Sequence, residues 1–100
     1  MPRTEKKKER PEYVFKSTPE FWRALDKLNG EQRAKADDAF AIFKANPFDP
    51  QLNPHKINKL TSRYGRTVHS VTIDGNLRAA FYIEENVVVS VDIGTHDIYK

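Results

Sequence analysis

The sequence predicts a single α+β domain, in which a helical hairpin packs on one face of a mainly antiparallel, four-stranded sheet. Two kinds of periodicity carry this prediction. Apolar residues recur at helical spacing between residues 19 and 45, and three later runs alternate apolar with polar residues as half-buried strands do. Turn sequences separate these segments, which gives the order β-α-α-β-β-β. A chain of 100 residues can form one modest core.

The composition is typical of a folded, soluble protein. Apolar residues make up 38% of the chain and charged residues 31%, and the aromatic side chains supply apolar surface for a core. No apolar run is long enough to span a bilayer or to act as a signal peptide, so we expect a cytoplasmic protein. The absence of Cys excludes disulfides, thiolate catalysis and Cys-based metal sites. We expect neither a metal nor another cofactor.

The N-terminal half predicts an arm, one strand and two helices. Residues 1–11 lack periodicity and are expected to form a flexible basic arm outside the domain of residues 12–100, whose first five residues are β-prone. Ser17 and Glu20 are spaced as a capping box at the start of the first helix. The second helix is expected from about Glu31 to Ala45. The short link between the two helices predicts an antiparallel hairpin.

A proline-rich loop and three strands are expected in the C-terminal half. Residues 46–54 contain three prolines, and residues 61–65 are expected to be polar and mobile. We expect the strands at residues 67–73, 77–83 and 87–93. In the last of these, alternation places four apolar side chains on the face that covers the helices, namely Val87, Val89, Val91 and Ile93.

Positive charge is concentrated in two parts of the chain. The formal net charge is +3, and residues 1–11 alone sum to +3, so the rest of the chain is neutral overall. Within that neutral part, residues 55–83 sum to +4. Either basic segment could attract phosphate, although a solvated tail is the simpler interpretation of residues 1–11.

Four motifs occur in a characteristic order along the chain. They are the loop NPFDPQLNPHKI after the second helix, Tyr64-Gly65 before a strand, the strand LRAAFYI with Arg78 near its start, and the ending VDIGTHDIYK. Together they resemble the RelE/ParE superfamily of bacterial type II toxin–antitoxin toxins over roughly residues 12–100. The resemblance implies a RelE-like fold and a small toxin that a cognate antitoxin holds inactive. Many members cut messenger RNA on the ribosome, whereas the ParE branch poisons DNA gyrase.

The ending of the chain supplies the first candidates for catalysis. Metal-free RNA cleavage needs a base for the 2′-hydroxyl, an acid for the departing 5′-oxygen and cations beside the phosphate, and His suits the proton transfers. By resemblance, His96 occupies the catalytic-histidine position of the YafQ-like branch, and Tyr99 is the nearby aromatic that stacks on a base or orients a phosphate. The segment could instead only turn the chain. Asp97 could orient a histidine or lie in solvent.

Arg78 and His55 are the other two candidate catalytic residues. Arg78 stands at the superfamily's motif position for an arginine that holds phosphate through two hydrogen bonds. The alternative is an ion pair with Asp92 or Glu84 across the neighbouring strands. His55 follows the proline-rich loop, which resembles the entry to the superfamily's active-site groove, and could be the second proton-transfer group.

Five further residues could contact RNA: Lys56, Lys59, Arg63, Arg66 and Tyr82. Simple solvation also explains both lysines, and the spacing of the two arginines does not require a nucleic acid. His69 fits a partly buried structural residue better than a catalytic one. Val71 stands where many relatives carry an Arg, so one cation expected by resemblance is missing.

These residues predict a ribosome-dependent, metal-independent mRNA endonuclease that inhibits translation and leaves a 2′,3′-cyclic phosphate and a 5′-hydroxyl. The expected partners are a cognate antitoxin, the ribosome and mRNA. Two alternatives stay open. One is a ParE-like toxin that poisons gyrase without cutting RNA, and the other is a degenerate toxin that only binds its antitoxin or RNA.

Overall fold

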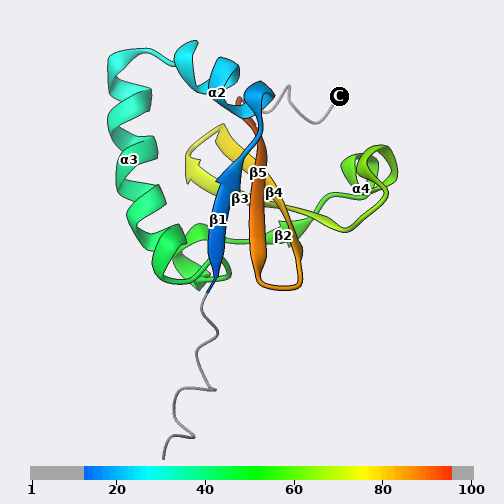
Figure 1. The fold of residues 1–100 in the computed structure, drawn as a ribbon. Helices are drawn as coiled ribbons and strands as arrows, with labels where there is room; N and C mark the ends of the chain where they lie inside the picture. Colours follow the sequence, from blue (N-terminus) through cyan, green and yellow to red (C-terminus); the bar gives the residue numbers. More distant parts are fainter. Residues whose placement is uncertain (1–12, 96–100) are drawn as a thin grey trace, which may run out of the picture.

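One mainly antiparallel sheet organises residues 13–95, which are the residues that the computed structural model describes, apart from the side chain of Lys59. Its strands lie in the order β1-β5-β4-β3-β2 (Figure 1). In chain order the elements are β1 (Val14–Ser17), α2 (Pro19–Asp26), α3 (Gly30–Ala45), a 3-10 turn (Pro50–Leu52), β2 (His55–Lys56), α4 (Asn58–Tyr64), β3 (Val68–Asp74), β4 (Leu77–Glu84) and β5 (Val87–Gly94). Strands β2 to β5 pair antiparallel, and β1 pairs parallel with β5.

The predicted α+β class is confirmed, and the prediction of the segment from residue 55 to residue 65 is wrong in two details. The sheet has a fifth strand, the two-residue β2, which pairs with β3. Residues 61–64 are helical rather than a mobile loop. The apolar side chains of Ile57 and Leu60 explain the helix, because both are buried against the sheet. The Thr61 hydroxyl also accepts a hydrogen bond from the backbone N–H of Val68, at 2.9 Å, and so joins α4 to β3.

The N-cap of the first helix lies one residue later in the chain than predicted. Thr18, not Ser17, is the N-cap of α2, and its hydroxyl accepts the backbone N–H of Phe21 at 3.1 Å. Ser17 instead ends β1. Helix α3 has a complete capping box, in which Asn29 and Gln32 each accept the other's backbone N–H.

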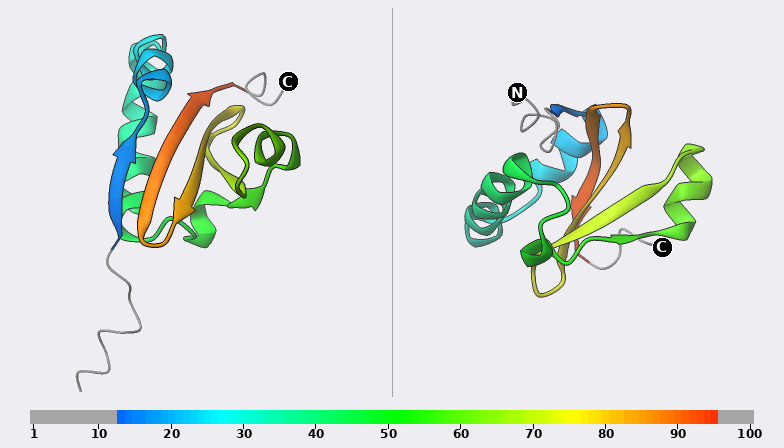
Figure 2. Two further views of the ribbon diagram at one scale, coloured as in Figure 1. Left: turned by 45° about the vertical axis from the view of Figure 1, so that its right-hand side comes forward. Right: turned by 90° about the horizontal axis from the view of Figure 1, so that it is seen from below.

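The main core lies between the sheet and the two N-terminal helices. Figure 2 shows α2 and α3 on one side of the sheet and α4 on the other. Phe21 and Phe43 from the helices meet Val71, Phe81 and other buried residues of β3 to β5. The ring centroids of Phe43 and Phe81 are 4.9 Å apart. None of the helices in the described part of the chain is long and apolar enough to cross a membrane.

A β-bulge in β5 overturns the predicted alternation of that strand. Ala80 lies opposite Asp92, but the next residue of β4, Phe81, lies opposite Ser90, so Val91 is an extra residue in the ladder. Ile93 consequently packs with the helices, as predicted, whereas Val91 packs under α4 together with Val89. The expectation that all four apolar residues share the helix side is therefore wrong, because the bulge reverses the phase of the strand.

Candidate active site

A row of four residues crosses the sheet on the face that packs against α4, called here the α4 face. His55 on β2 lies opposite Ser70, Ser70 opposite Ala80, and Ala80 opposite Asp92 on β5. Cross-strand partners project from the same face of a sheet, and Ala80 belongs to the apolar cluster under α4. The row therefore has a histidine at one end and a carboxylate at the other, with only small side chains between them.

The next row contains Arg78. Thr72 on β3 lies opposite Arg78 on β4, which lies opposite Gly94 on β5. The Arg78 Nη1 donates to the hydroxyl of Thr72 at 2.8 Å, and its Nε is buried without a hydrogen-bond partner. Among the described residues Arg78 forms no ion pair, so the predicted alternative of a bond to Asp92 or Glu84 is not observed there. Its guanidinium can therefore offer donors to an anion.

His55 is held through both of its ring nitrogens. Nδ1 lies 3.2 Å from the carbonyl oxygen of Asn53, and Nε2 lies 3.4 Å from the hydroxyl oxygen of Ser70. A carbonyl oxygen only accepts hydrogen bonds, so Nδ1 carries the proton in the neutral ring. Nε2 is then the basic nitrogen, and it points at the sheet beside the row that holds Arg78. This arrangement suits His55 for proton transfer.

Asp92 is a half-buried carboxylate at the far end of the His55 row. Burial raises the pKa of Asp92 above its usual range, against the opposing effects of a hydrogen bond from the Ile93 backbone N–H and of the positive charges of Arg63 and Lys27. Arg63, predicted to contact RNA, is exposed on α4 and contributes its charge to this carboxylate.

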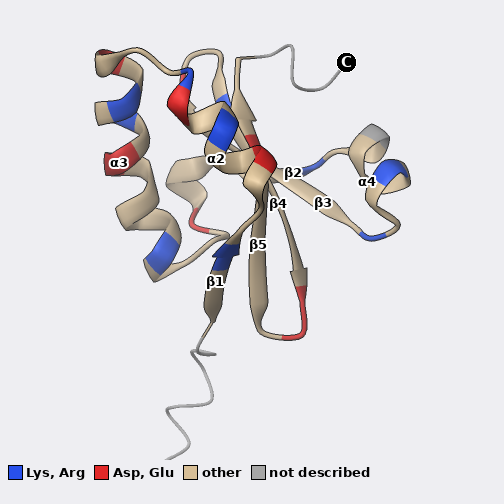
Figure 3. Cartoon of the chain, turned by 45° about the horizontal axis from the view of Figure 1, so that its top comes forward, with Lys and Arg blue, Asp and Glu red and all other residues tan. Residues whose placement is uncertain are grey.

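Two further predicted RNA-binding residues, Arg66 and Tyr82, contact each other beside α4. The Arg66 guanidinium lies 4.8 Å from the centroid of the Tyr82 ring, and its Nη1 is 3.0 Å from a carboxylate oxygen of Glu84. Tyr64 packs near the same ring, with centroids 6.3 Å apart. Arg66 is thus engaged by a carboxylate, unlike Arg78. Figure 3 shows the basic positions of β2, α4 and the α4–β3 connection at one end of the molecule.

Lys56 and His69 lie on the opposite face of the sheet from Arg78. They are cross-strand partners, and the His69 ring stacks on Phe81 at 5.5 Å and meets the edge of Phe48 at 5.2 Å. Burial, and then the charge of Lys56, lowers the pKa of His69. The structure therefore does not bring Lys56 to the side of Arg78, and it gives His69 the half-buried packing that the sequence predicted.

Several predicted residues lie outside the described part of the structure: His96, Asp97, Tyr99 and the side chain of Lys59. Two site residues, Ser70 and Thr72, were missed by the sequence prediction. The sequence contained a signal for both, because Ser70 and Thr72 flank the apolar Val71 in β3 and so lie on the face opposite the core. Val71 is buried on the helix side. An arginine at this position would therefore lie on the opposite face of the sheet from Arg78.

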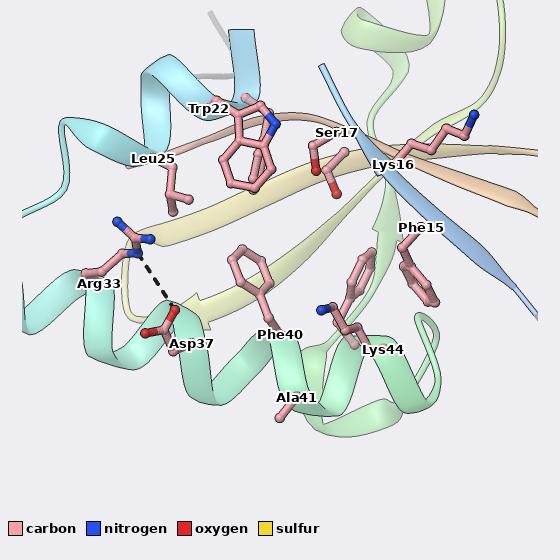
Figure 4. Close-up of a pocket in the computed structure, with 13 residues that line it drawn as sticks. Phe15, Lys16, Ser17, Trp22, Leu25, Arg33, Asp37, Phe40, Ala41 and Lys44 are labelled. Atoms are coloured by element: carbon pink, nitrogen blue, oxygen red, sulfur yellow. Dashed lines mark ion pairs between the residues drawn. The ribbon is translucent and has the colours of Figure 1, made fainter. Parts of the chain in front are cut away.

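A cavity of the described structure lies elsewhere, between β1, α2 and α3 (Figure 4). It has a volume of about 540 Å³. Aromatic side chains of Phe15, Trp22 and Phe40 line it, and Trp22 is 54% exposed. Lys16 and Lys44 also border this groove, and both are exposed. A groove with apolar walls and a basic border suits an amphipathic, acidic protein segment better than a small polar substrate.

Solved structures of bacterial and archaeal toxins share this arrangement of strands and helices. A chain of the archaeal RelE–RelB complex from Pyrococcus horikoshii OT3 superposes with a TM-score of 0.65 over 85% of this chain and 96% of that chain, at 13% identity. A copper-bound mutant toxin from Helicobacter pylori gives a TM-score of 0.66 over 88% and 99% of the two chains, at 16% identity. The chain has the fold of the RelE-like toxins.

The same RelE-like fold relates the chain to the Escherichia coli DinJ–YafQ complex. A chain of that complex superposes with a TM-score of 0.60 over 86% of this chain and 96% of that chain, at 11% identity. No protein-family model matches the sequence, and no curated protein matches it. The RelE-like fold is thus shared at low sequence identity, and the chemistry of the chain has to be argued from its own residues.

Proposed function

We propose that the protein is the toxin of a toxin–antitoxin pair and that it cleaves RNA on the α4 face of its sheet. The observation that carries this proposal is Arg78, whose guanidinium is half-buried, bonded to a neutral hydroxyl and unpaired with any carboxylate of the described residues. A cation held in this way is suited to a phosphodiester, whose charge increases in the transition state. The RelE-like fold supports the same conclusion.

The proposed reaction needs no group outside the chain and the RNA. The 2′-oxygen attacks the adjacent phosphorus while a base removes its proton, and the bond from phosphorus to the 5′-oxygen breaks. An acid gives a proton to the departing 5′-oxygen, which leaves a 2′,3′-cyclic phosphate and a 5′-hydroxyl. Arg78 stabilises the phosphorane-like charge. His55 Nε2 is one of the two proton-transfer groups, and by resemblance His96 is the other.

The groove between β1, α2 and α3 is the surface that we expect the antitoxin to cover. Complexes with RelB and DinJ are among the structures that share this fold. The exposed Trp22 offers an apolar anchor, and Lys16 and Lys44 would attract an acidic partner segment. The ribosome and mRNA would instead occupy the α4 face, so the two partners need not compete directly for the same side chains.

The proposal is tested in a translating extract, with cleavage of mRNA followed by primer extension. Arg78→Ala and His55→Ala should each lower the cleavage rate by about a hundredfold or more, because each removes a group that acts in the transition state. Arg23→Ala, an exposed arginine of α2, is the matched control and should cleave normally. Intact mRNA with the wild-type protein would contradict the proposal, and inhibition of DNA supercoiling by added gyrase would favour the gyrase alternative.

A further inference from the structure

We propose that the hydroxyl groups of Ser70 and Thr72 act together as positioning groups, which hold His55 and Arg78 side by side above β3. Neither hydroxyl needs to touch the substrate in this role. The effect of the two hydroxyls on catalysis rests on the proposed RNA cleavage. Their contacts with His55 and Arg78 do not depend on that function and can be measured without it.

The geometry of β3 brings the two functional side chains together. Ser70 and Thr72 are two residues apart on one strand, so they project from the same face with their Cα atoms about 7 Å apart. His55 reaches Ser70 from β2 on one side, and Arg78 reaches Thr72 from β4 on the other. The imidazole and the guanidinium therefore converge above the same short stretch of strand, where one phosphodiester could contact both.

Ser70 can hold the His55 ring in either protonation state. Its side chain is fully buried, at 0% exposure, and the His55 Nε2 lies 3.4 Å from its hydroxyl oxygen. A hydroxyl donates to Nε2 when the ring is neutral and accepts from it when the ring is protonated. At 3.4 Å this bond is long, so Nε2 can exchange it for an oxygen of the RNA during proton transfer, and the hydroxyl can hold the ring before and after that step. A carboxylate would favour only the charged ring.

Thr72 holds Arg78 without neutralising its charge. The bond from Nη1 to the Thr72 hydroxyl is 2.8 Å long and limits where the guanidinium can lie. A carboxylate in the same place would pair with the cation and compete with an anionic ligand, as Glu84 does for Arg66. The buried Nε of Arg78 keeps an unused donor. A neutral partner thus fixes the position of the cation and leaves its charge for a phosphate.

The positioning of His55 is tested by nitrogen NMR of its imidazole in the full chain. The wild type should show two distinct ring-nitrogen shifts, those of an Nδ1–H tautomer with a hydrogen-bonded Nε2. In Ser70→Ala the Nε2 signal should move towards the value of a ring without this bond. Ser90→Ala is the matched control, because Ser90 is the other buried serine of the sheet and lines the helix-side groove. It should leave His55 unchanged.

Two NMR results would overturn the assignment to Ser70. One is an unchanged Nε2 signal in a folded Ser70→Ala variant. The other is a wild-type Nε2 signal at the value of a ring nitrogen without a hydrogen bond, a result that stands even if Ser70→Ala does not fold. Both can be read whether or not the protein cleaves RNA.

The positioning of Arg78 is tested with a non-cleavable 2′-deoxy dinucleotide as the probe. Thr72→Val keeps the shape of the side chain and removes its hydroxyl, so it should weaken binding of the dinucleotide about tenfold. Thr72→Ser keeps the hydroxyl and should restore most of the affinity. Equal affinity in Thr72→Val and wild type would overturn the assignment to Thr72.

Cleavage measurements then connect the positioning pair to the proposed function. Ser70→Ala should lower kcat about tenfold at an unchanged KM, since it disturbs a proton-transfer group rather than a binding contact. If the wild-type protein cleaves no RNA, the proposed function fails, and the NMR and dinucleotide results still decide whether the two hydroxyls position His55 and Arg78. An unchanged kcat in Ser70→Ala, with the Nε2 signal shifted, would overturn the catalytic consequence alone.

Discussion

At the scale of single residues, the partners of two arginines decide which of them can bind an anion. Arg78 donates to the Thr72 hydroxyl, which is neutral, and keeps its full charge. Arg66 lies against the Glu84 carboxylate at 3.0 Å and over the ring of Tyr82. A phosphate that binds Arg66 would therefore compete with Glu84. The sequence alone does not distinguish the two arginines, whereas their neighbours in the structure do.

Glu84→Gln should therefore strengthen RNA binding. The substitution removes the negative charge that competes with phosphate at Arg66, so the affinity for a short single-stranded RNA at low salt should rise about two- to fivefold. Fluorescence anisotropy over a series of salt concentrations measures the effect, which should diminish at high salt. Glu20→Gln, which alters an exposed ion pair on α2, is the control. An unchanged affinity in Glu84→Gln would show that phosphate does not use Arg66.

His69 should make the folded protein less stable in mild acid. Burial lowers its pKa from the usual 6.5, so the unfolded chain binds the proton more readily than the folded chain. The free energy of unfolding should be unaffected by this group above pH 6.5 and should fall as the pH drops from 6.5 through the lowered pKa. Urea unfolding at pH 7.5 and pH 5 measures the difference. The fall in the free energy of unfolding between these two pH values should be smaller in His69→Phe than in the wild type. An equal fall in both proteins would show that His69 is not the group responsible.

At the scale of elements, α4 and the bulge of β5 build the face that carries the candidate site. The bulge turns Val91 towards α4, where Leu60 and Ile57 complete a small apolar cluster. Helix α4 has no side-chain N-cap bond and is short, so packing rather than intrinsic helix stability keeps it in place. This apolar cluster thus holds α4, and with it the basic residues of that helix, against the sheet.

Leu60→Ala should loosen α4 and cost stability. Leu60 is 2% exposed, and removing a buried leucine side chain costs about 2 to 4 kcal/mol. Denaturant unfolding measures the loss, and hydrogen exchange should show faster exchange in α4 than in α3. Leu28→Ala, a half-buried residue on the helix side, should cost less and leave the exchange of α4 unchanged. If the backbone amides of α4 exchange as slowly in Leu60→Ala as in the wild type, the cluster does not hold α4 in place.

The groove between β1, α2 and α3 should set the affinity for the antitoxin. Trp22→Ala removes its most exposed aromatic side chain, and loss of an aromatic anchor in an interface costs about 2 kcal/mol or more, so the dissociation constant should rise at least about thirtyfold. Calorimetry with the proposed cognate antitoxin measures the dissociation constant. Any cleavage of mRNA by the free protein should stay unchanged, because Trp22 is remote from the α4 face. Equal antitoxin affinity would place the partner elsewhere.

At the scale of the whole molecule, the distribution of charge matters more than its sum. The net charge of +3 equals that of residues 1–11, and residues 12–100 are neutral overall. The local excess of +4 in residues 55–83 runs through β2, α4, β3 and β4, the elements that form the candidate site. We therefore expect residues 1–11 to add non-specific attraction to nucleic acid and residues 12–100 to supply the chemistry.

Deletion of residues 1–11 should weaken salt-sensitive RNA binding more than cleavage. The deletion removes five basic side chains, so the slope of log affinity against log salt should become shallower by up to about three to four units for single-stranded RNA. Binding at several salt concentrations and kcat on mRNA measure the two effects. A folded deletion variant that binds RNA normally but has lost cleavage would contradict this division of roles.

The fold class and the faces on which several candidate residues lie could be predicted from periodicity in the sequence. Helical and alternating periodicity predicted α2, α3 and the strands β3 to β5 because adjacent residues encode the period of each element. The same alternation placed Arg78 opposite the core-facing side of β4 and His69 with Val71 on the helix side. Both placements are confirmed by the packing of those residues.

The way in which these elements meet could not be predicted from local sequence. The helix at residues 58–64 depends on packing against the sheet. The bulge at Val91, the separation of Lys56 from Arg78 and the contacts of Ser70 and Thr72 depend on the register between strands. A one-residue shift in such pairing turns a side chain to the other face, and nothing local in the sequence records that shift. Periodicity belongs to neighbouring residues, whereas register is set by packing across the whole sheet.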